Sequence, residues 1–285
     1  MKLIETDRFL KKFELKEFPQ PDIISLKYPV LMCHGYGAIA GLVKPSLLHE
    51  PCIVLRKCGV IAFAPNIVPY ATIEIRARQW AERIQQLKKQ YGFEKLNVVA
   101  HSMGGLDMRY AISELGIEDS VASLTTVSTP HRGTSLANFV LSTPELVKDK
   151  LAEFFDWFGD NIYPSAKSDA IAAVEQLTCD YVQQDFNSRI KNSENISYFS
   201  VSAAVGKGTK APLNAIFRFQ NQYIYQHEGL NDSFVSLESA KWGEHLKTVS
   251  LSHLEQTNIK VAKDRQKLVD DFWISLMNHL SKKGF

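Results

Sequence analysis

Long apolar stretches are missing from this 285-residue chain, although 45% of its residues are hydrophobic. Without a run of about 20 apolar residues, no segment is typical of a membrane-spanning helix. An excess of one charge is missing as well, because 33 basic and 31 acidic residues leave a net charge of only +2. A chain this balanced shows no overall preference for nucleic acid or for an anionic membrane surface. These absences favour a globular protein with a large core.

Cysteine is scarce, and no C-x-x-C spacing occurs among Cys33, Cys52, Cys58 and Cys179. That scarcity argues against a disulfide framework and favours a reducing compartment. Cys33 lies in an apolar strand pattern, where a buried free thiol is expected, and a Cys52–Cys58 bridge is the alternative. The first residues alternate charged and apolar side chains and lack the unbroken apolar stretch of a secretory signal. We therefore expect a cytoplasmic protein, with secretion as the alternative if a signal has been trimmed.

Repeats, low-complexity tracts and linkers are also missing, which predicts a single domain over residues 1–285. What the chain does show is an alternation of strand and helix patterns. Such alternation predicts an α/β fold with a mainly parallel central sheet and helices on both of its faces. The segment 212–231 is rich in turn-forming residues and is interpreted as loop-rich. Strands are expected at 28–33, 60–64, 97–100, 121–127, 196–202 and 245–251, and helices at 46–57, 72–91, 106–115 and 259–281.

The alternation breaks between residues 136 and 192. Apolar residues recur there at roughly helical spacing, and no strand pattern separates them. The run Phe154-Phe155-Asp156-Trp157-Phe158 offers more aromatic surface than one helix face can bury, because neighbouring helical residues point in different directions. We interpret this segment as a helical cap, or lid, inserted over an active site. The alternative is a set of helices that only cover the sheet.

The run NVVAHSMGGLD, from Asn97 to Asp107, predicts a strand, a tight turn and a helix in direct succession. Its two glycines permit a sharp bend, and Ser102 lies at the tip of the turn. This arrangement is typical of the nucleophile elbow, which exposes a serine hydroxyl above the carboxyl end of a sheet. The usual pattern is G-x-S-x-G, and Ala100 replaces the first glycine here. Ser102 is therefore the candidate nucleophile, provided that a base and an acid accompany it.

The candidate base is a histidine downstream of Ser102, since a serine hydroxyl is a poor nucleophile until a base takes its proton. Where a serine elbow is used, the chain order is serine, acid, histidine. His253 follows a strand and precedes the last helix, which places it at the carboxyl edge of the sheet, where ligands bind in such folds. His245 begins the same strand and belongs to the opposite edge, and His227 precedes the best carboxylate. The sequence therefore favours His253.

The candidate acid is Asp232, in the turn-forming run Gly229-Leu-Asn-Asp-Ser-Phe-Val235. A single Asp in such a run often only forms a turn. Because Asp232 lies between Ser102 and His253 in the chain, we favour it as the acid over a purely turn-forming role. Glu228 and Glu238 are the alternatives.

An oxyanion hole needs two backbone N–H groups that point at the developing negative charge. The residue after the nucleophile, Met103, offers one at the start of a helix, whose dipole adds to the effect. The second is expected in His34-Gly-Tyr-Gly37, directly after the first strand, where glycines let the backbone approach a substrate closely. Tyr36 N–H is the candidate.

With these residues together, the chain resembles the lipases and esterases of the α/β-hydrolase fold, and the bacterial triacylglycerol lipases most closely. The similar stretches run in the family's order from Tyr28 to Asn258: YPVLMCHGYG, NVVAHSMGGLDMRY, VSTPHRGTSLA, NDSFVSLESAKWGEHL and SHLEQTN. The resemblance implies that His131 and Arg132 support the site rather than react. It also implies a nucleophile, an acid, a base and two oxyanion donors at Ser102, Asp232, His253, Tyr36 and Met103.

Two departures from the family's pattern stand out. Some relatives bind a structural calcium near the catalytic histidine, through an acidic residue two positions after it. Glu255 occupies that position, but no further ligands are found, so we expect no metal and no cofactor. Asp-Ser replaces the usual Asp-Gly after Asn231, so the turn there differs from the family's.

The sequence thus predicts a serine hydrolase that cleaves carboxylic esters through a Ser-His-Asp triad and an acyl-enzyme. The aromatic-rich insertion favours medium to long acyl chains, such as those of acylglycerols. The expected partners are a small ester or lipid substrate and, transiently, a lipid interface; nucleic acid is not expected, and the oligomeric state is left open. The alternatives are a thioesterase or amidase on the same triad, and a hydrolase-fold protein that binds lipid without catalysis.

Overall fold

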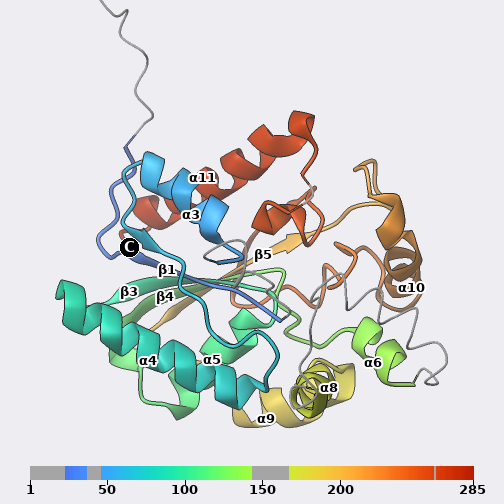
Figure 1. Cartoon of the computed structure of the whole chain (residues 1–285), viewed down its shortest axis with the longest axis horizontal. Helices are drawn as coiled ribbons and strands as arrows, with labels where there is room; N and C mark the ends of the chain where they lie inside the picture. The colour runs from blue at the N-terminus through green and yellow to red at the C-terminus, as the bar shows by residue number, and fades with distance from the viewer. Residues whose placement is uncertain (1–22, 37–45, 143–166, 260) are drawn as a thin grey trace, which may run out of the picture.

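A computed structural model describes residues 23–36, 46–142, 167–259 and 261–285 (Figure 1). Its centre is a six-stranded sheet in the order β2-β1-β3-β4-β5-β6, and every neighbouring pair of strands is parallel. Parallel strands require crossover connections, and here helices supply most of them. The strands are β1 (Val30–Cys33), β2 (Ala62–Phe63), β3 (Leu96–His101), β4 (Val121–Val127), β5 (Ser197–Ala203) and β6 (Glu244–Val249).

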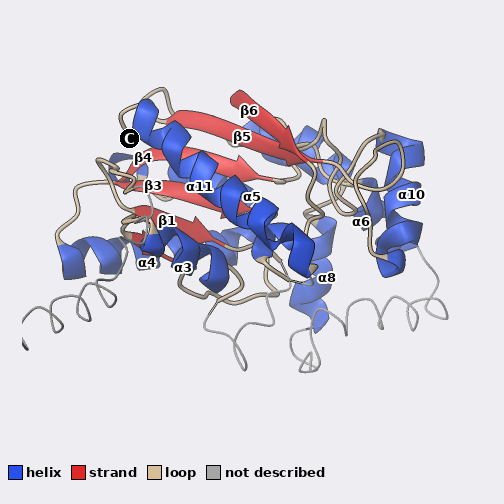
Figure 2. Ribbon diagram, turned by 90° about the horizontal axis from the view of Figure 1, so that it is seen from above, coloured by secondary structure: helices blue, strands red, loops and turns tan. Residues whose placement is uncertain are grey.

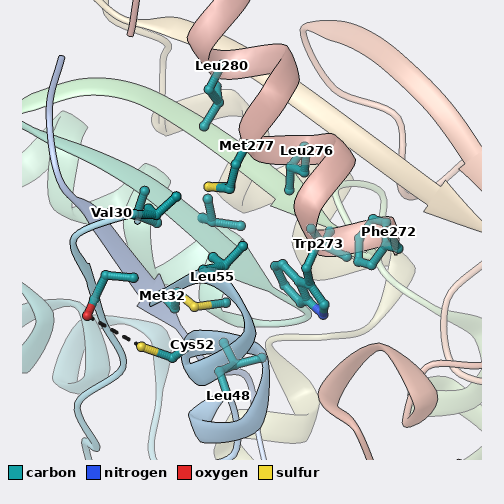
Figure 3. Packing of buried hydrophobic residues seen from close by; sticks show 14 of the residues in the cluster. Val30, Met32, Leu48, Cys52, Leu55, Phe272, Trp273, Leu276, Met277 and Leu280 are labelled. Atoms are coloured by element: carbon teal, nitrogen blue, oxygen red, sulfur yellow. Dashed lines mark hydrogen bonds between the residues drawn. The ribbon is translucent and has the colours of Figure 1, made fainter. Parts of the chain in front are cut away.

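Helices cover both faces of the sheet. α3 (His49–Lys57) and α11 (Gln266–Lys282) lie on one face, and α4 (Ile73–Tyr91) and α5 (Gly104–Glu114) on the other (Figure 1). Because strand side chains alternate, β1 supplies Val30 and Met32 to the first layer and Leu31 and Cys33 to the second. Figure 3 shows the first layer, where the β1 side chains meet residues of α3 and α11. The expected fold class, a parallel sheet with helices on both faces, is confirmed.

All four cysteines are free thiols in the structure. The Cys52 thiol donates a hydrogen bond of 3.4 Å to the carbonyl oxygen of Ala62, which joins α3 to β2 (Figure 3). The alternative Cys52–Cys58 bridge is therefore wrong. Among the described residues, no helix combines the length and the hydropathy that crossing a bilayer requires.

The described part of the predicted cap is helical. It comprises α6 (Ser135–Ser142), α8 (Lys167–Glu175), a π-helix (Tyr181–Phe186) and α9 (Asn187–Arg189). The aromatic run Phe154 to Phe158 lies outside the described residues. Ala173 of α8 and Val182 and Phe186 of the π-helix pack in one apolar cluster with Met103 and Leu106. The inserted helices therefore lie against the start of α5.

The segment 212–231, interpreted as loop-rich, contains a short 3-10 helix (Ala215–Phe217) and then α10 (Arg218–Glu228). The interpretation was wrong because the buried stripe of this helix includes amides: Gln220 and Asn221 are buried beside Ile224. The final helix also begins later than expected, at Gln266, after a 3-10 turn at Lys263–Arg265. In Figure 2 the arrowheads of the strands point towards the end of the molecule where α6 and α10 lie.

Candidate active site

Ser102 occupies a tight turn between β3 and α5, with a φ of +56°. A left-handed conformation is costly for any residue except glycine, so neighbouring contacts must hold it. The Ser102 N–H donates to the carbonyl of Val127 at 2.9 Å, and its own carbonyl accepts from the Thr129 hydroxyl at 2.7 Å. The end of β4 therefore fixes the turn from both sides.

Glycine is required around this turn by close contacts. A Cβ on Gly35 would lie 2.6 Å from the Ser102 Cβ, and one on Gly104 would lie 2.8 Å from the His34 carbonyl oxygen. A Cβ on Gly105 would lie 2.2 Å from the Thr129 hydroxyl. Neighbours this close leave no room for a methyl group.

At position 100, by contrast, there is room for the methyl group of alanine. Ala100 is the fifth residue of β3, paired with Cys33 on one side and Thr126 on the other. Its methyl group is fully buried in the apolar layer beneath α4 and α5. The first glycine of the usual pattern is therefore not needed for the bend, which begins only at Ser102.

Asp232 and His253 are hydrogen-bonded, with 2.7 Å between Asp232 Oδ2 and His253 Nδ1. The other carboxylate oxygen accepts from the backbone N–H groups of Phe234 at 3.0 Å and Val235 at 2.9 Å. The His253 N–H also donates to the Asp232 carbonyl at 3.0 Å. The two residues are thus joined through both side chains and backbone, although 20 residues separate them in the sequence.

Asp232 is fully buried, and burial by itself would raise its pKa. The charge of His253, together with the hydrogen bonds from His253 and Val235, outweighs burial and lowers the pKa of Asp232. Gln256 adds an amide donor 3.3 Å from Oδ2. The carboxylate is therefore ionised at neutral pH and accepts the Nδ1–H of His253, which leaves Nε2 as the nitrogen that can take a proton.

The ring of His253 contacts two other rings. Its centroid is 4.5 Å from that of His101 and 4.9 Å from that of Phe234. His101 is the residue immediately before Ser102, so this contact places His253 next to the β3–α5 turn. Burial first, and the charge of His253 second, lower the pKa of His101 well below its usual range. His101 is therefore a neutral neighbour of His253.

Tyr36 and Met103, the two candidate oxyanion donors, belong to one apolar cluster. The position of a Cβ on Gly35 would be 3.0 Å from the Met103 nitrogen, so the backbone that leads into Tyr36 passes next to that amide. Tyr36 also meets Tyr70 edge to face, with ring centroids 5.2 Å apart. The residues on the two sides of the proposed hole are thus brought together.

A buried ion pair, which the sequence reasoning missed, holds the first-strand loop in place. Arg76 of α4 donates from Nε to Asp107 of α5 at 2.9 Å, and both side chains are fully buried. Its Nη2 donates to the His34 carbonyl at 2.7 Å and its Nη1 to the Val68 carbonyl at 2.8 Å. Burial raises the pKa of Asp107 to about 6, against the lowering effect of Arg76. One guanidinium therefore links the helix that follows Ser102 to the loop that carries Tyr36.

The residues considered as alternatives for the acid and the base make other contacts. Glu228 accepts from the Ser135 N–H, and Glu238 pairs with Lys241 on the surface. His227 is exposed on α10, and His245 lies on the edge strand β6 beside Ser200 and Ser202. The structure joins neither glutamate to His253; it joins Asp232.

His131 and Arg132, in the STPHRGTS loop, hold this loop in place. Buried His131 hydrogen-bonds the Thr126 hydroxyl at 3.0 Å and stacks on Trp242 with ring centroids 5.1 Å apart. Arg132 donates to the carbonyls of Glu238 and Lys241. Both side chains therefore fasten this loop to the segment that precedes β6.

Glu255, at the position used for calcium in some relatives, is paired with Arg265 instead. Its Oε2 also accepts from the Ser252 N–H at 2.8 Å, and Arg265 reaches the Ser250 carbonyl. In the described residues, no group of three or more His, Cys, Asp or Glu side chains is arranged to hold a metal ion. The guanidinium of Arg265 thus holds the loop that carries His253.

Comparison with known proteins agrees with this architecture. The profile of the alpha/beta hydrolase fold family matches residues 28–255. Triacylglycerol lipase 2 of Saccharomyces cerevisiae is 29% identical over 260 residues, which cover 81% of this chain and 72% of that protein. The triacylglycerol lipase of Pseudomonas fragi is 25% identical, over 87% of this chain and 93% of its own. The crystal structure of Staphylococcus hyicus lipase superimposes with a TM-score of 0.69 at 16% identity, over 93% of this chain and 98% of that one.

Proposed function

This chain belongs to the α/β-hydrolase fold family and is a carboxylic ester hydrolase of its lipase and esterase group, and we propose that Ser102, His253 and Asp232 are its catalytic triad. The observation that carries the assignment is the 2.7 Å hydrogen bond between Asp232 and His253, beside a serine with a φ of +56°. The order serine, acid, histidine along the chain supports it as well.

The proposed reaction begins with acylation. Asp232 accepts the Nδ1–H of His253, so the Nε2 of His253 takes the proton of Ser102 as its oxygen attacks the ester carbonyl. The N–H groups of Tyr36 and Met103 donate to the resulting oxyanion. His253 then gives its proton to the departing alkoxide, and the alcohol leaves an acyl group on Ser102.

Deacylation repeats these steps with water. His253 takes a proton from the attacking water, the oxyanion forms again at Tyr36 and Met103, and the C–O bond to Ser102 breaks. The proton returns from His253 to the Ser102 oxygen, and a carboxylic acid is released. No group beyond this chain's own residues and water is needed for the balance of protons and electrons.

The proposed substrate is an ester of a medium or long acyl chain, such as an acylglycerol. Two observations favour an apolar acyl group: the cluster of Met103, Leu106, Val182 and Phe186 at the start of α5, and the ring of Phe234 against His253. The described helices α8 and Tyr181–Phe186 of the inserted segment are proposed to form this wall of the site. The names of the yeast and Pseudomonas relatives are in keeping with such a substrate.

The triad is tested by labelling the purified protein with a fluorophosphonate and mapping the adduct by mass spectrometry. We expect a single adduct on Ser102, and its loss in Ser102→Ala and in His253→Ala. A well-folded protein that forms no adduct, or an adduct that persists in His253→Ala, would contradict the assignment. The first result would favour the alternative of a lipid-binding protein without catalysis.

The substrate class is tested with nitrophenyl esters from acetate to decanoate. We expect kcat/KM to rise by at least about tenfold along the series, because each buried methylene adds hydrophobic free energy. A preference for acetate would overturn the acyl-chain proposal. The decanoyl thioester and anilide serve as matched controls, and faster turnover of either would replace ester hydrolysis by thioesterase or amidase activity.

A further inference from the structure

Arg109 of α5 is a buried cation that the proposed mechanism does not use. It is 1% exposed, and among the described residues no carboxylate lies at ion-pair distance from it. Burial lowers the pKa of Arg109 to about 9, so the guanidinium is still charged at neutral pH. A charge in the core without a counter-ion is costly unless other groups offset it. The contacts of this guanidinium therefore indicate what it is kept for.

Two aromatic rings contact the guanidinium. Its central carbon lies 3.7 Å from the centroid of the Trp242 ring and 5.1 Å from that of Phe186. Both distances are short enough for a cation–π attraction, which is stronger where the groups are shielded from water. Trp242 lies just before β6, whereas Phe186 ends the π-helix of the inserted segment. Arg109 therefore contacts the inserted segment and the segment before β6 at once.

Arg109 also holds the residues that follow Phe186. Its Nη1 donates to Asn187 Oδ1 at 2.9 Å, and its Nη2 donates to the Ile190 carbonyl at 3.3 Å. The amide nitrogen of Asn187 in turn donates to the His131 carbonyl at 2.8 Å. The end of the inserted segment is thus fastened to α5 by one guanidinium and to the STPHRGTS loop by one amide.

His131 extends this network into the sheet. Arg109 Nη1 lies 3.4 Å from His131 Nδ1, and a guanidinium can only donate. Nδ1 is therefore the acceptor, and Nε2 carries the proton that is donated to Thr126 Oγ1 at 3.0 Å. Burial, and then the charge of Arg109, lower the pKa of His131 well below its usual range, which keeps the ring in this neutral form. Since Thr126 belongs to β4, the anchor is tied to the central sheet.

Phe186 connects this anchor to the apolar cluster at the start of α5. It is fully buried and packs in that cluster with Met103, Leu106 and Val182. Leu106 lies three residues before Arg109, on the same side of α5. A displacement of Phe186 would therefore change the wall that is proposed to bind the acyl chain.

We propose that Arg109 is a positioning residue that sets the acyl-chain preference of the site. It holds Phe186 and Asn187 against α5, so that Phe186 and Val182 stay in place as a wall for the acyl chain. Arg109 acts through Phe186 and takes no part in proton transfer. Because an acyl chain must lie against this wall, the preference that Arg109 sets rests on the proposed function.

The experiment compares Arg109→Met with the parent protein on nitrophenyl acetate and nitrophenyl decanoate. Methionine fills much of the space of arginine but lacks its charge and its donors, so the end of the inserted segment loses its anchor. We expect kcat/KM for decanoate to fall by about tenfold through a higher KM, because the wall binds the acyl chain in the ground state and the transition state alike. Acetate offers only one methyl group to the wall, so its kcat/KM should change by less than about twofold.

Two further variants show whether Arg109 acts through Phe186. Arg109→Lys keeps a cation but lacks the planar fork that reaches Asn187 and Ile190 together, so it should retain only part of the preference for decanoate. Phe186→Leu should lower decanoate turnover much as Arg109→Met does. In the double variant Arg109→Met with Phe186→Leu, the loss should not exceed the larger single loss. Fully additive losses would contradict action through Phe186. Should Arg109→Met fail to fold, Arg109→Lys takes its place in the comparison.

Hydrogen–deuterium exchange tests the anchor without any substrate. Arg109→Met should speed the exchange of backbone amides between residues 181 and 190 and leave those of β1 unchanged. Leu276→Ala is the matched control, because Leu276 is 1% exposed in the layer on the opposite face of the sheet. It should destabilise the fold and leave the ratio of decanoate to acetate turnover as in the parent.

Two results would overturn the proposal: an unchanged ratio of decanoate to acetate turnover in Arg109→Met, or the same change of ratio in Leu276→Ala. The second would trace the effect to lost stability. The proposed function is read separately, from the fluorophosphonate adduct on Ser102. Arg109→Met should form that adduct as the parent does. Faster exchange over residues 181–190 in a variant whose parent forms no adduct would refute the triad and leave the anchor standing.

Discussion

The imidazole rings of His101 and His253 lie 4.5 Å apart and are inclined at 48°. Both are buried, yet only His253 has a carboxylate at hydrogen-bond distance. Burial and the charge of His253 lower the pKa of His101 well below its usual range, so the His101 ring is uncharged near neutral pH. The ring of the proposed base therefore packs against an uncharged ring.

Stability should fall as the pH drops below about 6.5. Burial is the main cause that lowers the pKa of His34 to about 3 and the pKa values of His101 and His131 well below their usual range. Their stabilising effect is complete above the unfolded-state value and is lost on acidification, because only the unfolded chain takes up the protons. Below the pKa of the unfolded state, each of these histidines lowers the free energy of unfolding by about 1.4 kcal/mol per pH unit.

One group acts in the opposite sense. Burial raises the pKa of Asp107 to about 6, so below that pH the folded state takes up a proton that the unfolded state does not. For these four groups, denaturant titrations between pH 7 and 5 should therefore show a slope that rises from less than about one proton near pH 7 to about two protons below pH 6. His131→Gln should reduce the slope by one proton. A stability that is constant over this range would contradict the buried neutral histidines.

Gly35→Ala should remove most activity while the protein stays folded. The new methyl group would lie 2.6 Å from the Ser102 Cβ and 3.0 Å from the Met103 nitrogen, so the loop that carries Tyr36, a proposed oxyanion donor, must move away from Ser102. Because misplaced donors act on the transition state, we expect a fall in kcat of about 10²-fold. Gly116→Ala is the control, since its position has a φ of +65° but no atom within 4 Å of the added carbon. That control should cost about 1 kcal/mol of stability and leave kcat unchanged.

Asp232→Asn should lower kcat by about 10⁴-fold with little change in KM. The amide can still occupy the carboxylate site, but its NH₂ group favours the wrong tautomer of His253. Circular dichroism should show a native fold, because the His253 N–H to Asp232 carbonyl bond does not involve the side chain. Steady-state kinetics on a nitrophenyl ester checks the prediction. If Asp232→Asn kept activity and Glu238→Gln lost it, the acid would be misassigned.

Arg76→Met should destabilise the protein by about 3 to 5 kcal/mol, because it leaves the buried Asp107 carboxylate without its partner. The double variant Arg76→Met with Asp107→Leu removes both charges and should recover part of that loss. Its kcat should remain low, since the His34 carbonyl still lacks the donor that holds the first-strand loop. Chemical denaturation measures the first effect and ester kinetics the second. Full activity in the double variant would show that the loop needs no such anchor.

Arg265→Met should lower kcat by releasing the loop that carries His253. The guanidinium pairs with Glu255 and reaches the Ser250 carbonyl, while Glu255 accepts from the Ser252 N–H. We expect a loss of about tenfold in kcat, and no response of the parent protein to a chelator. Lys267→Met, which breaks an exposed pair on α11, is the control and should be silent. A parent protein inactivated by the chelator would reveal a metal in place of this clamp.

Most of the fold could be predicted from local patterns. The strands of a buried parallel sheet are continuous apolar runs, and the elbow adds glycines at fixed offsets, so β3, Ser102 and α5 were all identified. The assignment to α/β-hydrolase lipases and esterases is confirmed as well. The catalytic roles of Ser102, Asp232 and His253 stay predictions.

The missed helix α10 and the overlooked Arg76 have a common cause, which is the burial of polar side chains. α10 was missed because Gln220 and Asn221 are buried, and Asn221 finds its partners in Val205 and Asn231, far from it in sequence. Arg76 was overlooked because a charged residue in a helix pattern is normally assigned to solvent. Its partners on the His34 loop and on α5 become neighbours only when the sheet is assembled.

Asp232 and His253 are joined by a backbone hydrogen bond in addition to the one between their side chains. The turn that carries Asp232, the proposed acid, is therefore linked through the backbone to the turn that carries His253, the proposed base. Substitution of the Asp232 side chain alters the proposed chemistry of the site but leaves this backbone hydrogen bond in place.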